Sequence, residues 1–291
     1  MSATALTLTL GILSLNLPAD RRNAEEMTAR LPDLYDLWDY NDPAGTRAKF
    51  EEILPGAETA ADISYHLQLL TQIARTYGLE AKFEDAHRLL DRVENSLTDD
   101  LALARVRYLL ERGRTYRSAG EASKASPLFL ESYELSLRID ADFYAVDAAH
   151  MVAIAASEFA EKEKWNLTGI RNAESSEDPR TRKWLGSLYN NMGWDYHERK
   201  EYDKSLTMFE RALAFRRKRG DAGEISVARW CIAKTYRFLN RIDEALEIQL
   251  ELLNEYEDSG SPDGYVFEEL GELYLIKNDS AKYTGYFAKA H

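Results

Sequence analysis

Residues 184–219 read WLGSLYNNMGWDYHERKEYDKSLTMFERALAFRRKR, and the architecture of the chain can be predicted from them. Small residues allow two antiparallel helices to approach closely, and aromatic residues fill the space around them. Such residues alternate along the stretch in a fixed order: Tyr189, Gly193, Tyr196, Tyr202, Ser205, Phe209 and Ala212. The stretch therefore predicts a pair of packed helices joined by a short turn.

The same order recurs along most of the chain. The position that holds Gly193 in this stretch recurs about every 39 residues, at Leu34, Ala74, Gly113, Ala156, Gly193, Ala233 and Gly271. A single helix pair cannot bury its apolar face, but stacked pairs share one continuous core. Since no strand-like alternation competes with this pattern, the sequence predicts an all-α protein.

This order resembles the tetratricopeptide repeat (TPR), whose pattern is W-x2-L-G-x2-Y followed by A-x3-F. The resemblance implies a right-handed superhelix of about seven helix pairs, with repeats longer than the usual length of about 34 residues. We expect this solenoid to occupy residues 23–291. Residues 1–22 form a separate N-terminal segment, which we expect to be disordered or packed on the first helices.

Prolines predict where several helices begin or end. The pair Pro55–Gly56 is expected to end the first unit. Pro127 falls inside an expected second helix, which therefore either begins late with Ser126 as its cap or kinks at the proline. Asp178 is the expected cap of a helix that has Pro179 at its first position.

Two units match the pattern weakly. In the first, Leu34 and Leu37 stand where the pattern has glycine and tyrosine. In the fourth, only Ala156, Phe159 and Trp165 approximate the pattern, so its register is open to a shift of a few residues.

Composition excludes several classes of protein. The chain has 291 residues and a net charge of −13, whereas nucleic-acid binders are usually basic, so we expect no nucleic-acid partner. The single cysteine, Cys231, excludes an internal disulfide and a cysteine-rich metal site.

The apolar N-terminal stretch, residues 2–17, is too short and too rich in threonine for a membrane-spanning helix. It also lacks the basic residues that begin a signal peptide, because the first basic residue is Arg21. We therefore expect a cytoplasmic protein without membrane partners. Secretion is the alternative if residues 1–19 act as an atypical signal.

The sequence contains no pattern typical of an enzyme. Its five histidines lack metal-binding spacing, and there is no glycine-rich phosphate loop or G-x-S-x-G motif. We expect no enzymatic activity, no catalytic residue, no cofactor and no metal. The carboxylate clamp of some TPR proteins is also absent, since only Asn191 falls at a matching position.

The resemblance implies that the first helix of each pair lines a concave groove. Two groups of residues at inward positions are candidates for binding a peptide. The first group consists of Asn190, Trp194, Trp230, Lys234 and Arg237, in which asparagine can pair with a peptide backbone and tryptophan offers an apolar wall. The second is an arginine cluster suited to carboxylates, formed by Arg75, Arg107, Arg114 and Arg117. The alternative for this cluster is a solvated face with salt bridges between units.

These features predict a non-enzymatic adaptor or scaffold that binds a peptide or helix of a partner protein. The alternative is a sensor of a small ligand or peptide pheromone, whose superhelix changes pitch on binding. The last unit has no polar capping helix after it. Its apolar face around Phe287 is therefore expected to be partly exposed or covered by a second subunit in a homo-oligomer.

Overall fold

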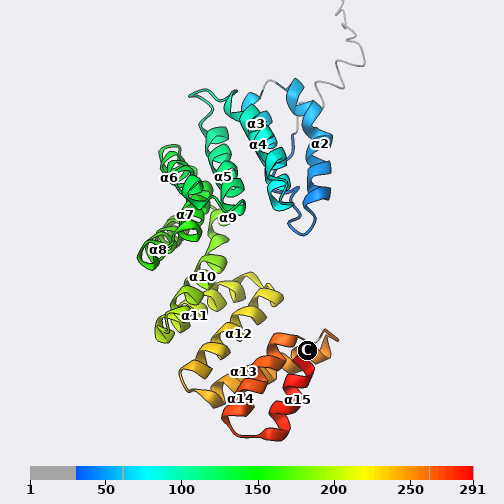
Figure 1. The fold of residues 1–291 in the computed structure, drawn as a ribbon, viewed down its shortest axis with the longest axis vertical. Coiled ribbons are helices and arrows are strands. Elements are labelled where there is room, and N and C mark those ends of the chain that lie inside the picture. Colours follow the sequence, from blue (N-terminus) through cyan, green and yellow to red (C-terminus); the bar gives the residue numbers. More distant parts are fainter. Residues whose placement is uncertain (1–30, 61, 262, 291) are drawn as a thin grey trace, which may run out of the picture. The chain divides into compact units, whose positions relative to one another are not determined.

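A computed structural model describes residues 31–60, 62–261 and 263–290, and all regular structure within these ranges is helical (Figure 1). The expectations for residues 1–22 lie outside these ranges. The chain divides into two compact units, one ending at Ser96 and the other beginning at Leu97. Each unit consists of antiparallel helices, as the repeat pattern predicts.

The first unit contains α2 (Pro43–Thr59), α3 (Ile63–Leu79) and α4 (Phe83–Glu94). The Asp42 carboxylate caps α2 by accepting a hydrogen bond from the Gly45 amide at 2.9 Å, and Pro43 fits the first helical position. Two expectations are wrong here. Helix α2 does not end at Pro55–Gly56 but continues for another turn, and the described residues before Asp42 form turns rather than a helix.

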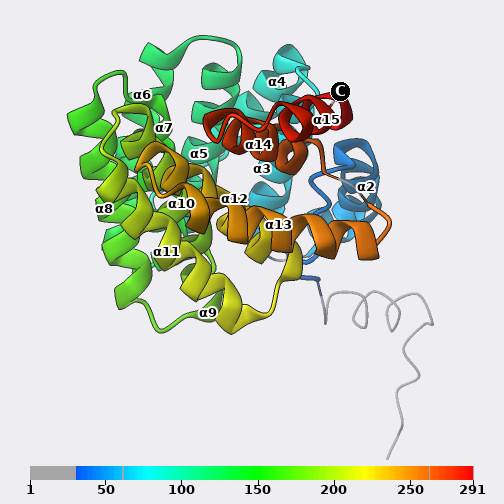
Figure 2. The same cartoon turned by 90° about the horizontal axis from the view of Figure 1, so that it is seen from below.

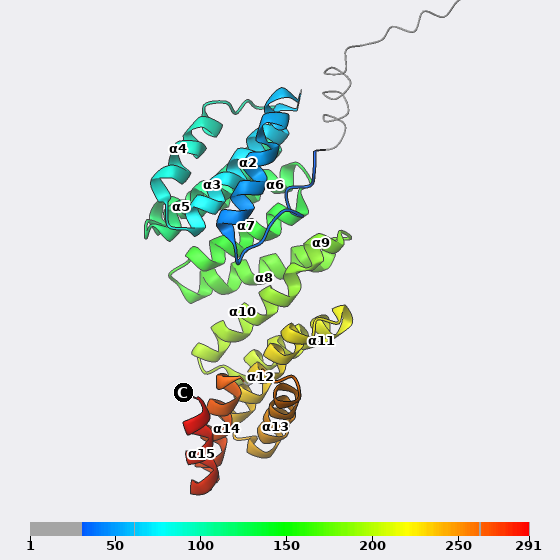
Figure 3. The same ribbon diagram turned by 90° about the vertical axis from the view of Figure 1, so that its right-hand side faces the viewer.

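The second unit consists of five helix pairs. Figures 2 and 3 show the two helices of each pair side by side. The pairs are α5 (Ala102–Ser118) with α6 (Ala122–Arg138), α7 (Asp142–Ala155) with α8 (Phe159–Ser175), α10 (Trp184–Glu198) with α11 (Tyr202–Arg219), α12 (Ala222–Phe238) with α13 (Ile242–Asp258), and α14 (Gly264–Ile276) with α15 (Ser280–Ala290). A short helix, α9 (Pro179–Arg182), precedes the third of these pairs.

A glycine on the first helix faces a phenylalanine on the second in three of these pairs. A methyl group on Gly193 would lie 2.5 Å from the ring of Phe209, and one on Gly271 would lie 2.6 Å from the ring of Phe287. Gly113 and Phe129 make the same close contact. The phenylalanine follows its glycine by 16 residues each time, so the predicted small-to-large packing is confirmed.

The pairs α3–α4 and α12–α13 have other residues at the positions of this glycine and this phenylalanine. Ala74 of α3 precedes Leu90 of α4 by 16 residues, and both side chains are fully buried. Ala233 of α12 precedes Gln249 of α13 by the same distance along the chain. The Gln249 side chain is 0% exposed, and neither its amide nitrogen nor its amide oxygen has a hydrogen-bond partner among the described residues. A polar group thus occupies a position that is apolar in the other pairs.

The expected register of the fourth unit is wrong. Ala156 lies just beyond the end of α7, where it is the C-cap residue. The alanine that precedes Trp165 by 16 residues is Ala149, which is fully buried. The register therefore shifts by seven residues, or two helical turns, toward the N-terminus.

The structure also shows where the helices near Pro127 and Pro179 begin. Helix α6 neither begins late nor has Ser126 as its cap, because its N-cap is Glu121 and it continues through Pro127. The Asp178 cap is confirmed, since its carboxylate accepts hydrogen bonds from the amides of Arg180 and Thr181, both at 3.0 Å. The helix that it caps, however, is only the short α9.

A residue with left-handed backbone conformation stands in most of the turns between the two helices of a pair. These residues have φ angles between 58° and 83°, at Ala81, Gly120, Lys200, Asn240 and Asn278. This conformation reverses the chain tightly after the first helix. It costs little at glycine but is strained at alanine or lysine.

The last helix, α15, covers the first helix of its own pair. The ring of Phe287 is half-buried against Gly271, and Tyr283 and Tyr286 pack on the same core. The exposed residues Lys282 and Lys289 of α15 place their ammonium groups over the rings of Tyr274 and Phe267 of α14. The burial of Phe287 is thus largely internal, and coverage by a second subunit stays a prediction. Among the described helices, none is both long and apolar enough to cross a membrane.

Candidate functional site

The first helices α5, α7, α10, α12 and α14 of the second unit carry most of the candidate residues. We call their exposed side the first-helix face. Trp194 on α10 and Trp230 on α12 meet there, with ring centroids 6.0 Å apart and ring planes at 41°. Both indoles are half-buried, so each presents an apolar surface to solvent. The structure thus brings together the two predicted tryptophans.

A cleft of about 240 Å³, the Trp230 cleft, opens beside these indoles. The Trp230 indole N–H donates a hydrogen bond to the Tyr265 carbonyl at 3.1 Å, which joins α12 to α14. Tyr265 itself is 69% exposed and Val227 is 49% exposed, so one side of the cleft is open and apolar. The lining residues are Trp194, Ser226, Val227, Trp230, Cys231, Tyr256, Asp263, Tyr265 and Val266.

A second cleft of about 280 Å³, the Arg117 cleft, is formed by residues of α5, α7, α8 and α10. Trp194 lines this cleft as well as the Trp230 cleft, so one indole belongs to both. The lining residues are Arg117, Ala153, Ile154, Lys162, Asn166, Asn191, Trp194 and Asp195.

The predicted basic residues Lys234 and Arg237 of α12 make ion pairs within the protein. Both contact the carboxylate of Glu269, a residue of α14 that is 1% exposed. The second contact of Arg237 with this carboxylate measures 3.2 Å, and Lys234 approaches it to 3.6 Å. Burial alone would lower the pKa of Arg237, but the hydrogen bond and charge of Glu269 outweigh burial and raise that pKa. These two cations therefore neutralise a buried anion.

The arginine cluster does not act as one group. Arg114 contacts the buried carboxylates of Glu111, at 2.6 Å, and Asp147. Arg117, one turn further along α5, is exposed at the edge of its cleft. Arg107 lies over the ring of Tyr144.

Arg75 belongs to the first unit. Its guanidinium lies 5.3 Å from the ring centroid of Trp38 and 5.2 Å from that of Tyr40, and these two rings stack on each other. Such cation–π contacts stabilise an arginine beside aromatic rings. Arg75 is therefore part of an aromatic cluster in its own unit.

The two neighbouring asparagines of α10 point to different surroundings. Asn190 is half-buried, and its amide oxygen lies 3.9 Å from the sulfur of Cys231. Burial raises the pKa of the Cys231 thiol to about 12, so this cysteine stays protonated and unreactive at neutral pH. Asn191, rather than Asn190, lines the Arg117 cleft.

His197 of α10 lies between the aromatic rings of this face. Its ring centroid is 5.2 Å from that of Trp194 and 4.8 Å from that of Phe238. Burial, followed by the positive charges of Lys234 and Arg237, lowers the pKa of His197. The imidazole is therefore neutral at pH 7 and adds to the aromatic surface.

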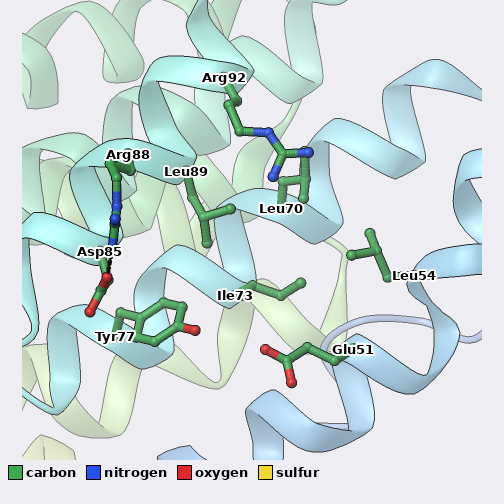
Figure 4. A pocket seen from close by; sticks show the side chains of 9 residues that line it. All are labelled: Glu51, Leu54, Leu70, Ile73, Tyr77, Asp85, Arg88, Leu89 and Arg92. Carbon is green, nitrogen blue, oxygen red and sulfur yellow. Dashed lines mark hydrogen bonds and ion pairs between the residues drawn. The ribbon is translucent and has the colours of Figure 1, made fainter.

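The first unit has a separate cleft of about 380 Å³ between its helices (Figure 4). The buried side chains of Leu70 and Ile73 from α3 lie on its inner side, and an ion pair between Arg88 and Asp85 of α4 lies at its rim. The other lining residues are Glu51, Leu54, Tyr77, Leu89 and Arg92. None of the predicted site residues is in this cleft.

Sequence reasoning gave salt bridges between units as the alternative for the arginine cluster, but it did not name the acidic partners of the predicted cations. Asp147 follows Arg114 by 33 residues and Glu269 follows Arg237 by 32, so each pair joins two successive first helices. An acidic residue at this distance from a basic one is a signal that the sequence did contain. Within the described ranges, no group of histidine, cysteine and acidic side chains is arranged to hold a metal ion.

The family model described as "Tetratricopeptide repeat" matches residues 185–219, which are the α10–α11 pair. No protein of curated function matches this chain in sequence.

Several solved structures share the fold. The apo form of RapI is 12% identical, with a TM-score of 0.72, and the match covers 93% of this chain and 75% of RapI. A signal-transduction ATPase with a tetratricopeptide-repeat sensor from Pyrococcus horikoshii is 16% identical, with a TM-score of 0.66. That match covers 85% of this chain and 37% of the ATPase. A Rap protein complexed with competence and sporulation factor is 12% identical, with a TM-score of 0.56 and coverage of 93% and 81%. At these identities the likeness shows the fold alone.

Proposed function

We propose that this chain, whose α10–α11 pair matches the tetratricopeptide-repeat family model, is a non-enzymatic interaction module that binds a peptide or helix of a partner protein on its first-helix face. The observation that carries this proposal is the contact between Trp194 and Trp230. Two half-buried indoles side by side still present apolar surface to water, and tryptophan is among the residues that contribute most to binding energy at interfaces.

The surroundings of the indoles suit an apolar side chain of a partner. The Trp230 cleft offers about 240 Å³, which holds one or two side chains rather than a whole ligand of drug size. Exposed Tyr265 and Val227 extend the apolar surface beyond the cleft. Lys234 lies 4.8 Å from the Trp230 ring centroid and helps to hold the ring in place. A peptide lying across these helices is therefore the occupant that the face fits best.

A sensor of a small ligand or peptide is the second candidate. It is favoured by the likeness in fold to RapI and to a Rap protein that was solved with competence and sporulation factor bound. In such a sensor the ligand would shift the helix pairs relative to one another, and a partner would read the change. A cytoplasmic location stays a prediction for both candidates.

Affinity capture with matched variants tests the proposal. The wild-type protein, Trp230→Ala and a control, Leu137→Ala, are used as baits, with mass spectrometry of the bound material. Leu137 is a suitable control because it is 48% exposed, lies on the second helix α6 and lines neither cleft of the first-helix face. We expect a discrete protein partner that binds wild type and control equally. Loss of a central aromatic anchor costs about 2 kcal/mol or more, so Trp230→Ala should weaken binding by roughly 30-fold.

Two results would contradict this function. A partner that binds Trp230→Ala as well as wild type would place the interaction elsewhere, with the arginines as the next candidates. A small molecule that co-purifies with the protein, in place of a protein partner, would favour the sensor. The melting temperature of Trp230→Ala must be measured too, because a large decrease would show that the indole mainly supports the fold.

A further inference from the structure

The two clefts of the first-helix face share one wall. Trp194 lines the Trp230 cleft and the Arg117 cleft, so a ligand that fills both must pass along this indole. An extended peptide rises about 3.3 Å per residue, so two or three residues are enough to pass one aromatic side chain. Neighbouring side chains of one short peptide can therefore enter the two clefts.

Arg117 differs from the other cations of this face. Arg114, Lys234 and Arg237 all contact buried carboxylates, and Arg107 lies over an aromatic ring. Within the residues that the structure describes, Arg117 makes no ion pair, and its guanidinium is exposed at the edge of its cleft. A cation without an anion, on a chain with a net charge of −13, is the place on this face where a ligand's negative charge is favoured.

The carboxylate among the lining residues of the Arg117 cleft, that of Asp195, already has partners. Asp195 accepts a hydrogen bond from the Asn166 amide at 2.8 Å and lies 3.4 Å from the ammonium of Lys162. Its side chain is only 15% exposed, and this burial raises the pKa of Asp195. Its charge therefore does not cancel that of Arg117.

The remaining walls of the Arg117 cleft suit a peptide chain. Asn191 presents an amide group, which can donate to a peptide carbonyl and accept from a peptide N–H at the same time. Ile154, which is 36% exposed, and Trp194 provide apolar contact on either side. Since Asn191 suits the backbone, the carboxylate that reaches Arg117 belongs to a side chain.

We propose that the first-helix face binds a peptide with an aspartate or glutamate side chain at Arg117 and, two or three residues away, a large apolar side chain in the Trp230 cleft. This inference rests on the proposed function and names the peptide's chemistry. Arginine binds carboxylates through two parallel hydrogen bonds, and this geometry selects them over amides of the same shape.

Synthetic peptides test this directly. The probes are fluorescently labelled, acetylated and amidated heptapeptides with one phenylalanine and one glutamate, placed two or three residues apart in either order. Matched peptides carry glutamine in place of glutamate, and a further set has no side-chain carboxylate but a free C-terminus. Binding is measured by fluorescence anisotropy against wild type, Arg117→Ala and Arg138→Ala. Arg138 is a matched control because it is exposed at the end of α6.

We expect at least one glutamate peptide to bind wild type and Arg138→Ala about 10-fold more tightly than its glutamine counterpart. Arg117→Ala should abolish this preference, while its affinity for the glutamine peptide stays unchanged. Preference for the free C-terminus over the glutamate side chain would overturn the inference, as would equal binding of glutamate and glutamine peptides.

The failure of the inference differs from the failure of the proposed function. If glutamate and glutamine peptides bind equally but Trp230→Ala weakens both, the face binds peptides and only the role of Arg117 is refuted. If no peptide of any set binds the wild-type protein at millimolar concentration, the inference is refuted, and the affinity capture with Trp230→Ala decides the proposed function separately.

Discussion

The Arg237 guanidinium donates hydrogen bonds to both oxygens of the Glu269 carboxylate, which joins α12 to α14 inside the second unit. Removing one partner of a buried ion pair leaves the other charge without compensation. We therefore expect Glu269→Ala to lower the free energy of unfolding by about 3 kcal/mol in urea titrations. The control is Glu272→Ala, since Glu272 is 39% exposed and lies 3.7 Å from the same guanidinium. Equal, small effects of both substitutions would show that the pair contributes little.

Gln249→Leu is expected to stabilise the protein. The Gln249 amide is fully buried without a hydrogen-bond partner, whereas Ala74 and Leu90 show that leucine fits opposite alanine at this position. Replacing the amide should raise the free energy of unfolding by about 1–2 kcal/mol. A decrease would mean that the amide has a bound partner in solution.

Phenylalanine at position 249 should require a second change. In the other pairs a methyl group opposite the ring would clash with it, so Gln249→Phe alone is expected to destabilise the protein against Ala233. Adding Ala233→Gly should recover the lost stability. A double-mutant cycle of thermal unfolding measures this coupling, and strict additivity of the two changes would contradict the packing argument.

Substitutions at the turn residues with left-handed backbone conformation should change stability in opposite directions. Lys200 has a φ angle of 62°, and Gly120 occupies the corresponding turn with a φ angle of 83°. Glycine adopts this conformation without strain, so Lys200→Gly should raise the free energy of unfolding by up to about 1 kcal/mol and Gly120→Ala should lower it. Shifts of the same sign in both variants would refute the explanation.

Stability should fall as the pH falls below 6.5. Burial, with the charges of Arg114 and Arg117, lowers the pKa of His150 from its usual value of 6.5, although Asp147 acts in the opposite direction. Below pH 6.5, His150 therefore binds a proton in the unfolded chain before it does so in the folded protein, and this difference favours unfolding. In urea titrations, His150→Gln should reduce the decrease in the free energy of unfolding between pH 7 and pH 5. Parallel curves for variant and wild type would assign the effect to other groups.

The sequence was sufficient for the repeated helix pairs because small and aromatic residues recur at fixed distances. It failed in the α7–α8 pair, where several alanines stand close together and the period alone did not distinguish Ala149 from Ala156. Burial, rather than composition, decides between such alternatives.

The candidate site was predicted in part. Trp194 and Trp230 were predicted at inward positions on successive first helices, and their contact agrees with this. The ion pairs of Lys234 and Arg237 could not be predicted, because they depend on whether the carboxylate of Glu269 is within reach. Charge at an inward position thus indicates either a ligand contact or an internal ion pair, and only the neighbouring helix separates the two.

The position of Trp194 between two clefts also makes it a natural optical probe. The chain has five tryptophans, and replacing Trp38, Trp165 and Trp184 with phenylalanine would leave only the two indoles that line these clefts. Their emission would then respond to an occupant on either side of Trp194 without any attached dye. Stopped-flow recording of that emission would resolve whether the two clefts fill in one kinetic phase or in sequence.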